Sequence, residues 1–317
     1  MSTSVETTSQ NFAEKLKAET AAVKFTSWKF GARKALSPDQ KTKAAEAFGA
    51  EGEILSASKK LLNTKHGKYK AVSTALNRPL GYWKLMTVWY PVKGIRLIRR
   101  DLIPQFEEQM ATYREELDQA VAVLQENYAE LRAAAEADLA ELFNSCDYPD
   151  TIGDYFGFKW EYPSVEPPNY LKELNPALYE AEKNRIAERF SNAVSHAEEA
   201  FTAELGNLVG HLVEKLSGKD EDGKPKTFNK SAVGNLNEFF SRFKTLSVGS
   251  NAELEALVSQ AEAAISGVDV SDLRKDKSLR EHVAGDLAKV QDVLDGLIVD
   301  KPSRAFRLDD DEEAVEV

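Results

Sequence analysis

The residues best suited to chemistry lie between Ile54 and Arg100, a stretch with 11 Lys and Arg and no Asp or Glu. Lysine and arginine neutralise phosphates, and aromatic rings stack on bases, so a basic stretch with interleaved rings fits a nucleic acid. The candidate nucleic-acid-binding residues are Lys59, Lys60, Lys65, Lys68, Lys70, Lys93, Arg96, Arg99 and Arg100. The interleaved rings are Tyr69, Tyr82, Trp83, Trp89 and Tyr90. In the alternative interpretation, the rings form a protein core and the cations neutralise the protein's own acidic helices.

The residue pattern gives little support to a nucleotide-binding, metal-binding or nucleophilic site. The chain contains no phosphate-binding GxxxxGK[ST] or GxGxxG loop and no GxSxG nucleophile motif. Its four histidines are scattered, and the nearest to a ligand pair, His211 with Glu214, reads better as an exposed helix pair. Cys146 has no recognisable base beside it in the sequence. We therefore expect no catalytic site, no bound metal and no cofactor.

Composition and charge indicate a folded, polarised protein. Hydrophobic residues make up 42% and charged residues 29% of 317 residues, as in globular proteins. Residues 1–110 hold 19 Lys and Arg against 10 Asp and Glu, and the remainder holds 22 against 42. A single cysteine fits a reducing compartment. The apolar run Leu85–Tyr90 is far too short to span a bilayer. We expect a cytoplasmic protein without a membrane segment.

Two long amphipathic helices dominate the pattern. From Phe106 to Leu142, apolar residues recur every three or four positions, which predicts one helix of about 38 residues. A second run begins at Asn175-Pro176, a capping residue followed by a first-turn proline, and ends at Gly218. Each stripe exposes much apolar surface in isolation. We therefore predict that the two helices pack together as an antiparallel hairpin.

Short strands are predicted beside these helices. Val23–Phe30 mixes β-branched and aromatic residues, and two similar runs flank a Pro91/Gly94 turn between Leu85 and Ile98. The aromatic segment Tyr155–Tyr162 is expected to pair either with Val23–Phe30 or with the hairpin.

Shorter helices complete the expected elements. Ser37-Pro38-Asp39-Gln40 has a capping-box pattern and predicts a helix to Phe48. The other expected helices cover Glu53–Leu62, Lys70–Asn77 before a break at Pro79 and Gly81, a segment from Val233 to Phe243, Asn251–Ser266 and Ser278–Val299.

The expected fold is mainly α (α+β). It comprises a long antiparallel helical hairpin, a small antiparallel sheet at one end of it and a C-terminal group of shorter helices. The expected domains are an N-terminal arm (1–20), the hairpin with the sheet and the basic segment (21–218), the C-terminal helices (227–300) and an acidic disordered tail (301–317).

Several motifs resemble a bacterial and bacteriophage family known as a domain of unknown function. The resemblance rests on Trp-x-x-Gly-x-Arg-Lys-x-Leu at Trp28–Leu36, the Pro91/Gly94 hairpin, a long helix, Phe156–Phe158, and the NLxxFxxxF-like run Asn235–Phe243. Members are often encoded near MoxR-type AAA+ ATPases and von Willebrand A-type proteins. The resemblance implies an accessory or adaptor role beside such an ATPase, and it assigns no catalytic residues.

The leading functional hypothesis is a non-enzymatic interaction, scaffold or adaptor protein of a bacterium or phage. It follows from the long helices, the polarised charge and the lack of site chemistry. Nucleic-acid binding through the basic segment is the alternative. A membrane pore-former and a homo-oligomer joined through apolar helix stripes remain further alternatives, although no membrane partner is expected.

Overall fold

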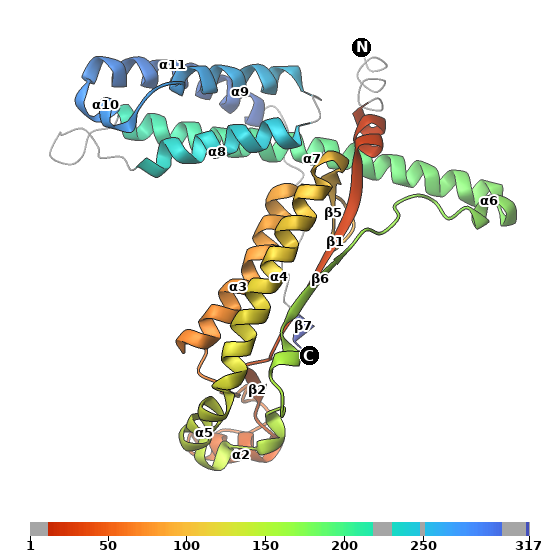
Figure 1. Ribbon diagram of the computed structural model, residues 1–317, viewed down its shortest axis with the longest axis vertical. Helices are drawn as coiled ribbons and strands as arrows, with labels where there is room; N and C mark the ends of the chain where they lie inside the picture. The colour runs from red at the N-terminus through yellow and green to blue at the C-terminus, as the bar shows by residue number, and fades with distance from the viewer. Residues whose placement is uncertain (1–11, 218–229, 248–250, 300–314, 317) are drawn as a thin grey trace. The chain divides into compact units, whose positions relative to one another are not determined.

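The computed structural model describes residues 12–217, 230–247, 251–299 and 315–316 (Figure 1). The chain forms two compact units, and each combines separated chain segments. Unit 1 contains Met1–Val23, Leu85–Arg100 and Tyr162–Arg307, and unit 2 contains Lys24–Lys84, Asp101–Glu161 and Leu308–Val317. The units therefore alternate along the chain, whereas the domains expected from the sequence were contiguous.

The fold is mainly α with a small antiparallel sheet, which confirms the predicted class. The strands are β1 (Thr20–Lys29), β2 (Arg33–Ala35), β3 (Ser58–Lys60), β4 (Val88–Trp89), β5 (Ile95–Arg99), β6 (Gly157–Glu161) and β7 (Val315–Glu316). The helices are α2 (Pro38–Glu46), α3 (Gly67–Met86), α4 (Ile103–Glu126), α5 (Tyr128–Leu139), α6 (Tyr170–Leu174), α7 (Pro176–Ser217), α8 (Lys230–Leu246), α9 (Ala252–Ile265), α10 (Val270–Lys275) and α11 (Lys277–Val299). Residues 12–19 are also helical.

The sheet has the strand order β4-β5-β1-β6, with β7 added in parallel to the end of β1. Both short strands of the predicted hairpin are present as β4 and β5, paired antiparallel across a turn in which Gly94 has φ 75°. The predicted strand at 155–162 is β6, and it takes the first of its two expected partners, β1. Of the predicted tail 301–317, the described residues are only Val315 and Glu316 of β7.

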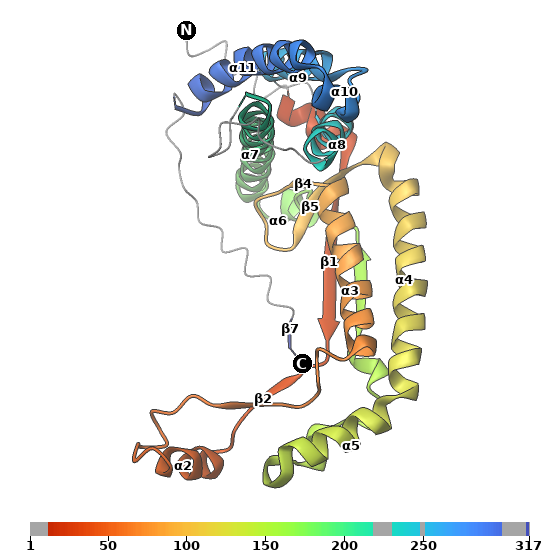
Figure 2. The ribbon, with the colours of Figure 1, turned by 90° about the vertical axis from the view of Figure 1, so that its left-hand side faces the viewer.

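Unit 2 places helices α3 and α4 beside the β1–β6 ladder (Figure 2). Phe25 of β1 stacks on Trp83 of α3 at 5.6 Å and on Phe158 of β6 at 5.7 Å between ring centroids. Tyr82 of α3 stacks on Phe106 of α4 at 5.8 Å. These aromatic contacts join sheet and helices into one core, because large flat side chains bury much apolar surface.

A glycine permits a close contact in the β1–β6 ladder. Gly157 of β6 lies opposite Trp28 of β1, and the indole covers the glycine so closely that an added Cβ would lie 2.2 Å from a ring atom. Only hydrogen fits there, which fixes the ring over the ladder.

A two-stranded ribbon and several short helices form the other part of unit 2. Strands β2 and β3 pair antiparallel, with Arg33 opposite Lys60 and Lys34 opposite Lys59. Helix α2 follows β2 and begins as predicted, since Ser37 and Gln40 form a reciprocal capping box.

Unit 1 is built around the long helix α7, which packs mainly on α11 and also on α8 and α9. Its start agrees with the prediction, since Asn175 accepts a hydrogen bond from the Leu178 amide at 3.1 Å. Phe201 of α7 forms an aromatic cluster with Phe239 and Phe243 of α8. Tyr90, just after β4, lies against Phe190 of α7 at 5.3 Å.

The predicted partner of this helix is wrong. The hairpin prediction placed the Phe106–Leu142 stripe against it, but α4 and α5 belong to unit 2. Helices of the C-terminal region bury the stripe of α7 instead. A periodic stripe shows that a helix needs an apolar partner and does not identify that partner.

The first long helix is also broken, at Asn127, into α4 and α5. The Asn127 side chain donates to the Val123 carbonyl at 2.8 Å, so it takes the acceptor that the backbone amide would use in a continuous helix. That amide instead bonds to the Leu124 carbonyl at 3.1 Å.

Two other expectations near the N-terminal part of unit 2 are wrong. Helix α3 continues through Pro79 and Gly81, where a break was expected, and ends at Met86, within the residues expected to form the first strand of the hairpin. Its buried face, with Trp83 only 2% exposed, offsets the hydrogen bond lost at the proline. In the segment Glu53–Leu62 no helix forms; its residues Ser58–Lys60 are β3, which pairs with β2.

The C-terminal helices that the structure describes agree with the prediction. Asn251 caps α9 by accepting from the Leu254 amide at 2.9 Å. Asp276 accepts from the Ser278 amide at 2.8 Å at the start of α11, and the sequence analysis missed the short helix α10 before it.

Substitution of Gly157 by alanine is expected to destabilise the protein by about 1–3 kcal/mol, because the new methyl group must displace the Trp28 ring. Chemical denaturation measures the loss. Gly81→Ala is the matched control: no atom lies near its added Cβ, and alanine in helix α3 is expected to stabilise by about 0.5–1 kcal/mol. Equal effects of the two substitutions would contradict the close packing at Gly157.

Tyr128, the first residue of α5, is expected to make the fold less stable at alkaline pH. Burial raises its pKa from 10.0 to about 12, and its hydroxyl has no hydrogen-bond partner among the described residues. Above pH 10 the unfolded chain loses this proton first, so stability falls between pH 10 and 12, by at most about 1.4 kcal/mol per pH unit. Tyr128→Phe should leave stability at pH 7 nearly unchanged and reduce the alkaline loss in pH-dependent denaturation. Exposed Tyr170→Phe should leave both the stability at pH 7 and the alkaline loss unchanged.

Candidate functional site

The nine predicted nucleic-acid-binding residues fall into both units. Lys93, Arg96, Arg99 and Arg100 belong to unit 1. The other five belong to unit 2: Lys59, Lys60, Lys65, Lys68 and Lys70. Each group is therefore considered within its own unit.

The arginines of unit 1 bind backbone carbonyls. Arg96 donates to the Thr87 hydroxyl at 2.7 Å and to the Thr87 carbonyl at 3.0 Å, across the β4–β5 hairpin. Arg99 donates to the carbonyl of Thr245 at 2.9 Å, near the C-terminal end of α8, where a cation also opposes the negative end of the helix dipole. Arg100 donates to the carbonyl of Thr20 at 3.1 Å, and Lys93 is exposed at the hairpin turn. These arginines support the local fold.

Two buried charges of unit 2, Asp147 and Lys59, form an ion cluster with the exposed Lys34. The Asp147 side chain is 2% exposed, and its two carboxylate oxygens lie 2.7 Å from the ammonium groups of Lys34 and Lys59. The Lys59 ammonium also donates to the carbonyl of Leu142 at 2.6 Å. Burial alone would raise the pKa of Asp147, but hydrogen bonds from Lys34 and Lys59 lower it below the ordinary 3.8. Lys59 thus stabilises the fold and is not available on the surface.

Two members of this cluster, Lys34 and Asp147, were not predicted from the sequence. Lys34 precedes the acid-free segment and was noted only as part of the family motif, and Asp147 follows Cys146 in a loop without periodicity. Two pairs of like charges directly opposite one another are unfavourable in a sheet, so no pairing rule predicts them.

The remaining lysines of unit 2 are accessible. Lys60, Lys65 and Lys70 are exposed, and Lys68 is half-buried. They lie in the part of the acid-free segment that connects β3 with the first turn of α3.

The aromatic side chains of the segment lie mostly inside the protein. Tyr69, Trp83 and Tyr90 are buried. Tyr82 stacks on Phe106, and Trp89 stacks on His196 of α7 at 4.4 Å. Three of the five rings therefore belong to the core, as in the alternative interpretation, and they offer no face to a base.

Unit 1 carries a helical end with exposed apolar side chains, here called the apolar arm: Tyr170, Leu174 and Leu178. They are 62%, 76% and 46% exposed, respectively, on α6 and the first turn of α7. The first buried side chain of α7 is Ile186, so the helix begins more than two turns before its stripe is covered.

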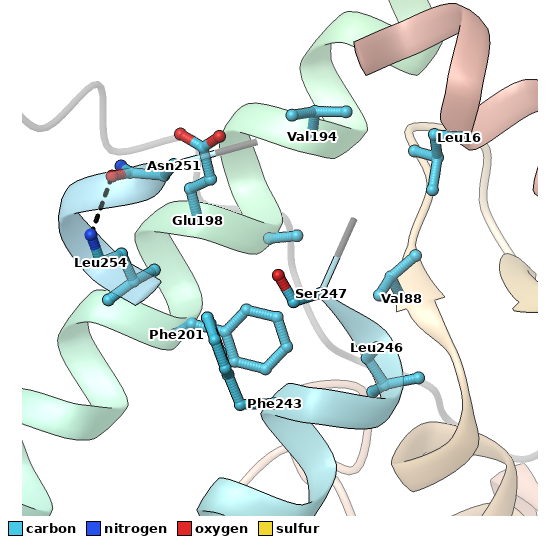
Figure 3. A pocket seen from close by; sticks show the side chains of 11 residues that line it. Leu16, Val88, Val194, Glu198, Phe201, Phe243, Leu246, Ser247, Asn251 and Leu254 are labelled. Carbon is cyan, nitrogen blue, oxygen red and sulfur yellow. Dashed lines mark hydrogen bonds between the residues drawn. The ribbon is translucent and has the colours of Figure 1, made fainter. Parts of the chain in front are cut away.

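Two hollows lie among the described residues of unit 1, and neither suits an obvious ligand. One holds about 20 Å³ between Phe201, Phe243 and Leu246, with the half-buried Glu198 at its edge (Figure 3). That volume accommodates roughly one water molecule. A second hollow of about 380 Å³ lies at Ser266–Asp269. Its carboxylates already serve the fold, since Glu262 pairs with Lys244 and Asp269 caps α10.

Within the described residues, no group of three or more His, Cys, Asp or Glu side chains is placed to hold a metal ion. Cys146 is exposed and forms no disulfide in that part of the chain. No described helix combines the length and the apolar composition needed to cross a bilayer.

Replacing Asp147 with asparagine is expected to lower the free energy of unfolding by about 3–5 kcal/mol, because the buried Lys59 charge loses its counter-charge. The folded-state pKa lies below 3.8, so this stabilisation is complete above pH 3.8 and is lost as pH falls through the lowered value. Acid and denaturant titrations measure both effects. The exposed Asp154→Asn should change neither, and an equally stable Asp147→Asn protein would refute the role of the cluster.

No family model matches this chain, and no curated protein or solved structure proves significantly similar to it.

Proposed function

We propose that this protein is a non-enzymatic interaction or scaffold protein and that unit 1 binds a protein partner through the apolar arm. The observation that carries this proposal is the exposure of Tyr170, Leu174 and Leu178 on one helical end. Single exposed apolar residues are common on protein surfaces, but neighbouring large ones often belong to interfaces.

The surroundings of the arm suit a protein interface. The charged side chains near the arm form ion pairs with each other. The Lys183 ammonium lies 3.4 Å from the Glu180 carboxylate, and Arg185 pairs with Glu182. The exposed turns therefore carry balanced charge although the chain has a net charge of −11. A partner that covers the apolar side chains meets no uncompensated charge there, and aromatic anchors such as Tyr170 contribute strongly to binding.

The family resemblance gives this proposal a candidate partner. An accessory or adaptor role beside a AAA+ ATPase of a bacterium or phage is compatible with a helix that projects unburied apolar residues. A second copy of the chain is the other partner that the arm could bind.

Nucleic-acid binding is the second candidate function, and one observation favours it. Lys60, Lys65, Lys68 and Lys70 of unit 2 remain at least partly accessible in a stretch of chain without acidic residues. The burial of Lys59 and of three aromatic rings limits this function to phosphate contacts, without base stacking by those rings.

The arm is tested with Leu174→Gln/Leu178→Gln, compared with Val293→Gln, a similarly exposed apolar residue on α11. We expect each protein to keep its free energy of unfolding within about 0.5 kcal/mol, because the side chains are exposed. Partners cross-linked to the wild type in its native host should be retained by the Val293 variant and lost from the arm variant. Light scattering over a range of concentrations shows whether the partner is a second copy.

Two results would contradict this proposal. If the arm variant retains every partner, the arm is not the interface. If the purified protein shows a turnover that one substitution abolishes, the non-enzymatic assignment is wrong.

A further inference from the structure

The β2–β3 ribbon of unit 2 brings four cations together in two directly opposed pairs. Lys34 lies opposite Lys59, and Arg33 lies opposite Lys60. Backbone bonds extend the same register on both sides, from the Leu61 amide to the Ala32 carbonyl at 2.8 Å and from the Leu36 amide to the Ala57 carbonyl at 3.0 Å. The pairing is therefore a continuous antiparallel ladder, and each pair occupies one face of it.

The two faces of the ribbon differ in how their charge is compensated. The Lys34/Lys59 pair faces Asp147, whose carboxylate lies 2.7 Å from both ammonium groups. Because side chains alternate along a strand, Arg33 and Lys60 occupy the opposite face. Both are exposed, and neither forms an ion pair with any residue that the structure describes.

The next opposed pair on the same face of the ribbon is Ala35 with Ser58, and both are small and exposed. A guanidinium, an ammonium and a hydroxyl thus share one face of the ribbon on exposed residues. These three groups are hydrogen-bond donors, and arginine binds phosphate oxygens in a bidentate manner.

We propose that Arg33, Lys60 and Ser58 form a phosphate clamp for the phosphodiester backbone of a nucleic acid. Opposed like charges destabilise a ribbon. Asp147 neutralises the Lys34/Lys59 pair, whereas the Arg33/Lys60 pair has no counter-charge among the described residues, and an external anion best explains this arrangement. The proposal rests on the second candidate function and adds Arg33 and Ser58 to its residues.

A polyanion with regular charges fits this surface better than an acidic peptide. The basic side chains continue along the chain from Lys60 to Lys65, Lys68 and Lys70 in the same unit, with no acidic residue between them. The protein has 52 acidic residues and places none of the described ones against Arg33 or Lys60. A run of phosphates can contact the clamp and the lysines that follow it.

The test measures the binding of the full chain to a labelled single-stranded oligonucleotide and to a duplex of equal length while the salt concentration rises. Arg33→Gln and Lys60→Gln should each lower the slope of log affinity against log salt by about 1, and the double variant should bind about tenfold more weakly at low salt. Thermal unfolding should show no loss of stability, because removing one charge of an opposed pair relieves repulsion. Lys159→Gln, an exposed strand lysine of the same unit, is the control and should leave the slope unchanged.

The possible results distinguish a failure of the clamp from a failure of nucleic-acid binding as a whole. If the wild type binds neither oligonucleotide at low salt, both the clamp and the second candidate function are wrong. If it binds and the double variant keeps the wild-type slope, only the clamp is wrong. If a peptide with the sequence of residues 308–316 competes with the oligonucleotide at equal concentration, the clamp binds acidic peptide and its assignment to nucleic acid is overturned.

Discussion

One buried carboxylate allows the β2–β3 ribbon of unit 2 to exist. Lys34 and Lys59 lie opposite one another, and Asp147 contacts both at 2.7 Å from a loop far along the chain. Without that carboxylate, the buried Lys59 ammonium would have no counter-charge, which is among the most costly situations in a protein interior. The ribbon, the loop around Asp147 and the arrangement of the outer cations therefore depend on one carboxylate.

Unit 1 depends on a different constraint, the length of α7. Helices α11, α8 and α9 pack on α7, Tyr90 after β4 lies against its Phe190, and its first buried side chain is Ile186. A helix longer than its partners must either expose apolar side chains or replace them with polar ones. The chain retains Tyr170, Leu174 and Leu178 at this end, and the proposed interface follows from that choice.

Local patterns predicted local structure well. The capping box at Ser37, the start of α7 at Asn175 and the strands β1 and β6 follow from residue types a few positions apart. The errors concern contacts between distant residues. The partner of α7, the passage of α3 through Pro79 and the strand β3 all depend on burial against segments that a periodic pattern does not identify.

The candidate sites show the same division. The acid-free segment was visible in the sequence, yet only the register of the ribbon separates the accessible Lys60 from the buried Lys59. Asp147 and Arg33 acquire their roles from cross-strand and loop contacts, so they carried no signal of their own. Adjacent residues of equal charge can thus have opposite roles, one internal and one external.

The alternation of the two units along the chain has a consequence for biogenesis. The polypeptide passes from one unit to the other five times between Met1 and Val317. A nascent chain emerging from the ribosome therefore cannot complete unit 1 before most of unit 2 has been synthesised. A premature stop before residue 307 removes material from both units, so quality-control proteases would meet two incomplete cores instead of one intact domain.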